Sequence, residues 1–76
     1  MDRGELDEAI AEYREAVRID PSLAQVHYNL GEALRQQGDR AGSARELRNF
    51  LRLAPSSPAS KEQIERARNI LLELKK

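Results

Sequence analysis

The stretch VHYNLG, residues 26–31, decides the fold because it places a glycine inside an amphipathic helix. Apolar side chains recur around it at three- and four-residue steps, the period of a helix with one buried face. Glycine within a helix costs about 1 kcal/mol relative to alanine, so we expect Gly31 to let a facing helix approach closely. The predicted buried face consists of Leu23, Val26, His27, Leu30, Ala33 and Leu34.

Outward from this stretch, the sequence repeats itself. Gly4 and Gly38 are 34 residues apart, and so are Pro21 and Pro55. Self-similarity at one fixed offset is the signature of a repeat architecture. Between these anchors the same offset pairs Ala9 with Ser43, Tyr13 with Leu47, Ala16 with Phe50, Val17 with Leu51, Arg18 with Arg52 and Ile19 with Leu53.

Helix boundaries can be predicted from prolines, glycines and capping residues. The segment Asp20-Pro21-Ser22 ends a first helix, because a residue before proline avoids helical angles. Gly38 is a typical left-handed helix end, and Asp39 is a typical N-cap for the next helix. Ser57-Pro58 is a typical start for a further helix. Short connections favour antiparallel neighbours, so we predict an all-α fold of about four helices in hairpins, without strands.

These residues resemble the tetratricopeptide repeat. That family repeats with the same period, in the order Trp, two residues, Leu-Gly, two residues, Tyr, then Ala, three residues, Phe, and a late Pro. Leu30-Gly31 and Pro55 match the pattern, and the resemblance implies an α-solenoid of helix hairpins. The first segment matches at Ala9, Tyr13, Ala16 and Pro21. The departures are His27 for Trp, Leu34 for Tyr, Ser43 for Ala and Leu47 for Phe. The loss of Trp at position 27 predicts weaker packing between the two helices.

The resemblance divides one domain, residues 1–76, into three parts. Residues 4–21 correspond to the second helix of an incomplete repeat, residues 22–57 to one complete repeat, and residues 58–76 to a terminal capping helix. About three repeats are usually needed for stability, so the first helix should present a face without a partner. We expect another copy of the chain to cover that face, including by exchange of elements. The candidate self-association residues are Ala9, Tyr13, Ala16 and Leu72.

Charge is balanced overall but unevenly distributed. The chain has 13 Lys and Arg against 13 Asp and Glu. Residues 1–21 carry seven acids and three bases, a net charge of −4, whereas residues 22–57 and 58–76 each carry five bases and three acids, a net +2 apiece. An acidic head and a basic tail favour association with complementary surfaces, including another copy of the chain.

The resemblance also implies a concave groove, lined by the first helix of each pair, that binds a peptide or helix. Tyr28 is the strongest single candidate there, because an exposed aromatic ring with a hydroxyl suits recognition. Carboxylate capture, which some members of the family perform, is not carried over, since Tyr28 and Glu32 do not fit it. The groove candidates are Gln25, Tyr28, Asn29, Glu32, Arg35 and Gln36. The alternative for each of them is a solvated surface.

Two functions follow from these patterns. The first is a protein-interaction scaffold that binds a partner segment on its concave face. The second is a self-associating fragment without an external ligand. No enzyme is expected, because neither a nucleophile beside a base nor a phosphate-binding glycine loop is present.

Other ligands have little support in the sequence. His27 has no second His or Cys to complete a metal site, so we expect a packing role for it and no cofactor. Arg45, Arg48 and Arg52 form a basic stripe without interleaved aromatic residues, which favours a solvated face over nucleic acid. No apolar run approaches the ~20 residues that span a bilayer. We therefore expect a soluble chain without a membrane partner, with the cytoplasm favoured.

Overall fold

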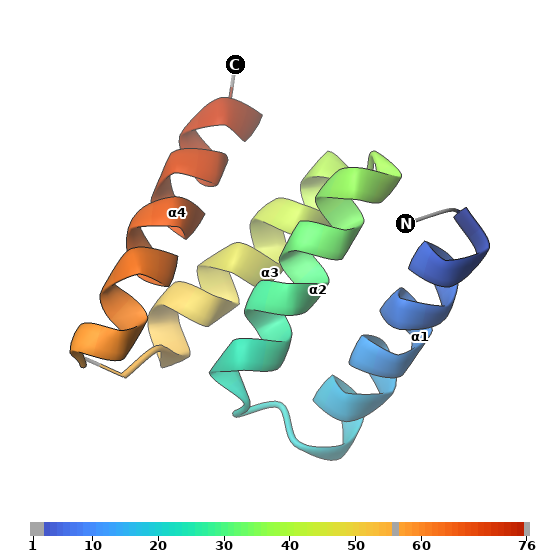
Figure 1. The fold of residues 1–76 in the computed structure, drawn as a ribbon, viewed down its shortest axis with the longest axis horizontal. Helices are drawn as coiled ribbons and strands as arrows, with labels where there is room; N and C mark the ends of the chain where they lie inside the picture. The colour runs from blue at the N-terminus through green and yellow to red at the C-terminus, as the bar shows by residue number, and fades with distance from the viewer. Residues whose placement is uncertain (1–2, 56, 76) are drawn as a thin grey trace.

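Four helices account for most of the chain. The structure, a computed structural model, describes residues 3–55 and 57–75. The helices are α1 Arg3–Ile19, α2 Ala24–Gln37, α3 Arg40–Leu53 and α4 Pro58–Leu74. Consecutive helices run antiparallel and pack mainly against their neighbours in the chain (Figure 1). No strand occurs in the described ranges, so the predicted all-α architecture is confirmed.

The repeat is visible in the helix boundaries. Ile19 and Leu53, the last residues of α1 and α3, are 34 residues apart. Ala24 and Pro58, the first residues of α2 and α4, are separated by the same 34 residues. The pair α1/α2 is therefore the structural equivalent of the pair α3/α4.

Glycines and an aspartate set the turn between α2 and α3. Gly38 ends α2 with a φ of 97°, in the left-handed region that favours glycine. Asp39 then caps α3, since its side chain accepts a hydrogen bond from the Gly42 backbone N–H at 2.9 Å. A Cβ added at Gly42 would lie 2.8 Å from the Asp39 Cγ. Gly42, for which the sequence offers no reason, leaves room for the capping carboxylate.

Replacing Asp39 by alanine should lower the free energy of unfolding by about 1 kcal/mol, the usual effect of losing an N-cap side chain. Asp39→Asn should keep most of the stability, because the amide oxygen can accept the same bond from Gly42. Urea denaturation of both variants measures the difference. Equal losses in both variants would contradict a capping role.

Two expected helix starts differ in detail from the structure. Ser57 precedes α4 and Pro58 is its first residue, as predicted, but the Ser57 side chain caps no backbone N–H. Its hydroxyl lies 3.3 Å from that of Ser60 instead. Leu23, predicted on the buried face of α2, precedes that helix and is 42% exposed, because the turn after Pro21 places it outside the packed helix face.

The core consists of two clusters that meet at α2. One joins α1 to α2 and the other joins α2 to α3 and α4. The first contains Leu6, Ile10, Leu30, Ala33 and Leu34. The second contains Tyr28, Leu47, Phe50, Ala67 and Ile70. Because α2 contributes to both clusters, it is the central element of the fold.

Gly31 has the role expected of it. A Cβ added there would lie 2.8 Å from both Cγ and Cδ2 of Leu47, whose side chain is 0% exposed. The Ser43 hydroxyl on α3 donates a hydrogen bond to the Gly31 carbonyl at 2.7 Å. The missing side chain therefore brings the backbones of α2 and α3 close together.

His27 replaces the expected tryptophan with a buried polar contact. Its Nδ1 lies 2.7 Å from Glu46 Oε1, and its Nε2 lies 2.8 Å from the Pro21 carbonyl oxygen. Because that carbonyl can only accept, Nε2 carries a proton. Glu46 is itself only 8% exposed. His27 is therefore buried, as its predicted packing role requires, and it also forms hydrogen bonds that link α2 to α3 and to the turn before α2.

Candidate protein-interaction site

The predicted groove face of α2 is divided by its neighbours. Tyr28 is 7% exposed, and its ring centroid lies 5.0 Å from that of Phe50 on α3. Burial, and to a smaller extent the charge of Glu32, raise the pKa of Tyr28 above its usual value. The prediction that Tyr28 is an exposed recognition residue is wrong, because α3 and α4 enclose its ring. Its role in the structure is to fill the second core cluster.

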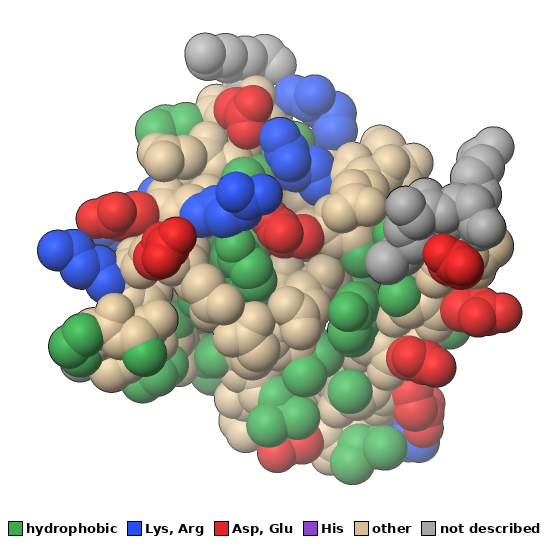
Figure 2. Space-filling view, in the orientation of Figure 1, with side chains coloured by type: hydrophobic (Ala, Val, Ile, Leu, Met, Phe, Trp, Pro, Cys, Tyr) green, Lys and Arg blue, Asp and Glu red, His purple; other side chains and the backbone are tan. Residues whose placement is uncertain are grey.

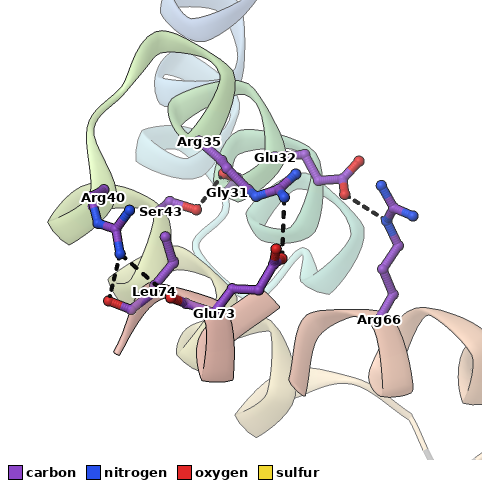
Figure 3. Close-up of polar contacts among 8 residues, drawn as sticks. All are labelled: Gly31, Glu32, Arg35, Arg40, Ser43, Arg66, Glu73 and Leu74. Carbon is purple, nitrogen blue, oxygen red and sulfur yellow. Dashed lines mark hydrogen bonds and ion pairs between the residues drawn. The ribbon is translucent and has the colours of Figure 1, made fainter. Parts of the chain in front are cut away.

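Two further candidates hold α2 to α4. Arg66 Nε on α4 lies 2.7 Å from Glu32 Oε1, and Arg35 lies 3.2 Å from Glu73 Oε2 (Figure 3). Hydrogen bonding to Glu32 raises the pKa of Arg66 further. Since these pairs lie at the surface, each contributes only about 0.2–1 kcal/mol. Both pairs lie on the side of α2 that faces α4.

A groove remains open between α2 and α1. It has a volume of about 150 Å³ and combines apolar residues with amide and carboxylate side chains. In Figure 2, apolar surface is visible between these two helices, and acidic side chains gather along the α1 edge. The lining residues are Leu6, Ala9, Tyr13, Asn29, Glu32, Ala33 and Gln36. We call this feature the α1/α2 groove.

The α1/α2 groove unites residues from two separate predictions. Ala9 and Tyr13 come from the expected self-association face, whereas Asn29, Glu32 and Gln36 come from the expected peptide groove. Leu6 and Ala33 complete it, and Ala33 had been predicted only as a core position. Of the other candidates, Gln25 is exposed and donates to Asn29 at 3.1 Å, Ala16 is half-buried on α1, and Leu72 lies apart on α4, 61% exposed.

The other end of the chain supplies a template for this groove. Each groove residue has an equivalent 34 positions later in the chain. These pairs are Ala9 and Ser43, Tyr13 and Leu47, Glu32 and Arg66, and Gln36 and Ile70. Ser43 and Leu47 both meet α2 at Gly31, and Arg66 binds α2 at Glu32. The position equivalent to the α1/α2 groove is therefore filled by a helix, namely α2.

The basic stripe predicted on α3 lies on an exposed helix face, and metal-ligating residues do not cluster in the described part of the chain. Arg45, Arg48 and Arg52 are exposed on α3, and Arg52 donates to Asn49 at 3.1 Å. Within residues 3–55 and 57–75, no group of three or more His, Cys, Asp or Glu side chains could hold a metal ion. In the same part of the chain, no helix is both long enough and apolar enough to cross a bilayer.

Comparison with known families agrees with the repeat geometry. A TPR repeat model matches residues 1–38, and a tetratricopeptide repeat model matches residues 24–57. No curated protein matches the chain significantly. The first family model covers half of the chain, and the two together reach from residue 1 to residue 57. The chain belongs to the tetratricopeptide repeat family.

Proposed function

We propose that this chain is a protein-interaction module that binds a helix of a protein partner in the α1/α2 groove. Repeats of this family generally mediate protein–protein interactions. The observation that carries the proposal is the equivalence between this groove and the position that α2 fills beside α3 and α4.

The chemistry of the groove suits a helix. Ala9 and Tyr13, which are half-buried, provide the apolar surface, and the small Ala9 allows a helix backbone to approach; Leu6 and Ala33 also line the groove but are largely buried. Asn29 and Gln36 provide amide groups at the margin, where hydrogen bonds fix orientation. Covering half-exposed apolar surface supplies the main favourable free energy of such an association.

A second copy of the chain is the alternative occupant. Its α4 is the repeat equivalent of α2. If α4 of one copy occupied the groove of another, Lys61 would take the place of His27 and would approach Glu12, the equivalent of Glu46. However, α4 carries Glu65 at the position of Gly31. A side chain there would collide with Tyr13, so α4 cannot approach α1 as closely as α2 approaches α3. Self-association therefore ranks second.

Ala9→Arg should weaken binding by placing a long side chain in the groove. Helical peptides selected from a display library against the intact chain should bind Ala9→Arg at least about tenfold more weakly, since a blocked central contact commonly costs 2 kcal/mol or more, roughly thirtyfold. The change costs the helix little, because arginine is a good helix former. Arg48→Ala, on the exposed face of α3, is the control and should leave affinity unchanged. Equal binding to Ala9→Arg would exclude the groove as the receptor.

The self-association alternative is tested by sedimentation equilibrium at several concentrations. A partner-binding module with an open groove should give the mass of one chain throughout. A mass that rises with concentration, and that falls back in Ala9→Arg, would favour the second copy as occupant.

A further inference from the structure

We propose that the α1/α2 groove selects a basic amphipathic helix that carries an aromatic residue and a glycine at fixed positions. This inference rests on the proposed function and identifies the chemistry of the partner. α2 contacts particular residues on α3 and α4. A helix in the groove would contact the residues 34 positions earlier, on α1 and α2.

A carboxylate occupies equivalent positions of the repeat on α3 and on α1. On α3, Glu46 contacts His27 of α2 at 2.7 Å. The equivalent residue on α1 is Glu12, which is exposed. Among the described residues, none forms a salt bridge with Glu12. A helix in the groove would therefore place a basic side chain at the position of His27.

At the position equivalent to Glu32, an incoming helix should carry the opposite charge to that of α2. On α2, Glu32 faces the cationic Arg66 of α4. A helix in the groove would face Glu32 itself, so its residue at that position should be basic. Arg66 binds Oε1 of Glu32, and the other carboxylate oxygen points away from Arg66 (Figure 3). The acidic character of residues 1–21, net −4, extends the same preference around the groove.

Side-chain size defines two more positions. Phe50, which packs on Tyr28 of α2, is replaced by Ala16 on α1. The space that this leaves suits a larger aromatic residue, such as tryptophan, at the position of Tyr28. Leu47, which leaves no room for a Cβ at Gly31, is replaced by the larger Tyr13. Glycine is therefore required at that position of the incoming helix.

The resulting pattern is basic, aromatic, two residues of any kind, glycine, basic. The chain's own α4 has Lys61, Glu62, Glu65 and Arg66 at these four positions. Both basic residues are present, but the aromatic residue and the glycine are not. The charge of α4 is complementary to the groove and its shape is not, so α4 of a second copy does not fit the pattern.

A synthetic peptide can test the pattern directly. The probe is residues 20–38 of this chain with His27→Arg, Tyr28→Trp and Glu32→Arg, acetylated and amidated at its ends. Titrated into the intact isotope-labelled chain, it should shift the backbone resonances of Ala9, Tyr13 and Ala33. A matched peptide with Gly31→Leu in addition should bind at least about fivefold more weakly, because the added side chain overpacks a close contact between helices.

Charge selection is tested on both partners. The chain with Glu12→Gln should bind the probe about threefold more weakly, and the chain with Glu12→Arg about tenfold more weakly, as loss and reversal of one exposed pair imply. Circular dichroism of both variants checks that the helices are retained. A second matched peptide has glutamate at both basic positions and should bind more weakly than the probe.

The outcomes separate the two proposals. If the glutamate peptide binds as tightly as the probe at the same resonances, charge selection is wrong and the helix receptor stands. If the Gly31→Leu peptide binds equally well, the glycine requirement is wrong. If neither these peptides nor the library-selected helices shift groove resonances, the proposed function fails as well.

Discussion

Leu47→Ala is expected to lower the free energy of unfolding by about 2–5 kcal/mol. Leu47 is 0% exposed and packs with Tyr28 and Phe50 in the cluster that joins α2, α3 and α4. Truncation removes apolar contacts and leaves a cavity against Gly31, whose lack of a side chain prevents local filling. Small domains commonly have about 5 kcal/mol of stability in total, so this variant should be largely unfolded in modest urea. Leu47→Val should show a smaller loss of the same kind.

A double-mutant cycle shows whether the loss arises at the contact with Gly31. Gly31→Ala alone should destabilise by about 1–3 kcal/mol, because the added Cβ overlaps the Leu47 side chain. In the Leu47→Ala background the same change should be neutral or stabilising, since the space is free and alanine gains about 1 kcal/mol in helix propensity. Urea denaturation measures all four stabilities. Additive effects, or stabilisation by Gly31→Ala alone, would contradict the close approach of α2 and α3.

His27→Phe is expected to cost about 3 kcal/mol although it adds apolar surface. The change removes the partner of both the Glu46 carboxylate and the Pro21 carbonyl. Removing the hydrogen-bond partner of a buried carboxylate is costly because the remaining group loses water without compensation. Arg45 Nε lies 3.7 Å from the other Glu46 oxygen, at the surface, and offsets part of the loss.

The matched control for His27→Phe is a second change at its partner. His27→Phe combined with Glu46→Leu should recover most of the stability, because no buried carboxylate then remains. Thermal and urea denaturation of the single and double variants give the comparison. A loss below about 0.5 kcal/mol in His27→Phe would mean that the hydrogen bonds contribute nothing.

Local chemistry made the helices predictable. Proline after Asp20, the left-handed Gly38 and the serine–proline start of α4 act over a few residues, so their effects can be read without the fold. The role of Gly31 was also predictable, since a glycine within a helix indicates a close neighbour. Glu46 was not identified as a partner of His27, because 19 residues separate them and only the packing of α3 on α2 brings them together.

Tyr28 shows where helix periodicity is insufficient. Its polar neighbours Gln25, Asn29 and Glu32 place it on the hydrophilic side of α2, and a hydroxyl suits that side. However, α2 contacts α1, α3 and α4, so a helix with three neighbours buries more than one stripe. Which side α4 covers depends on how the helices cross, and that information is not contained in spacing along one helix.

The candidate site was predicted in parts. Ala9 and Tyr13 were assigned to one function, and Asn29 and Gln36 to another, because they lie on different helices. Antiparallel packing of α1 on α2 places them in one groove. Sequence reasoning named these residues but could not predict that they act as one surface.

The two-cluster core has a consequence for the dynamics of α1. Because α1 is held mainly through one cluster, on one side of α2, it can detach while the cluster of α2, α3 and α4 stays intact. Repeat structures unfold in such steps, with the terminal unit opening first. Amide protons of α1 should therefore exchange with solvent faster than those of α3. A helix bound in the α1/α2 groove would contact another side of α1 and so stabilise it. Binding should therefore slow the exchange of the α1 amide protons.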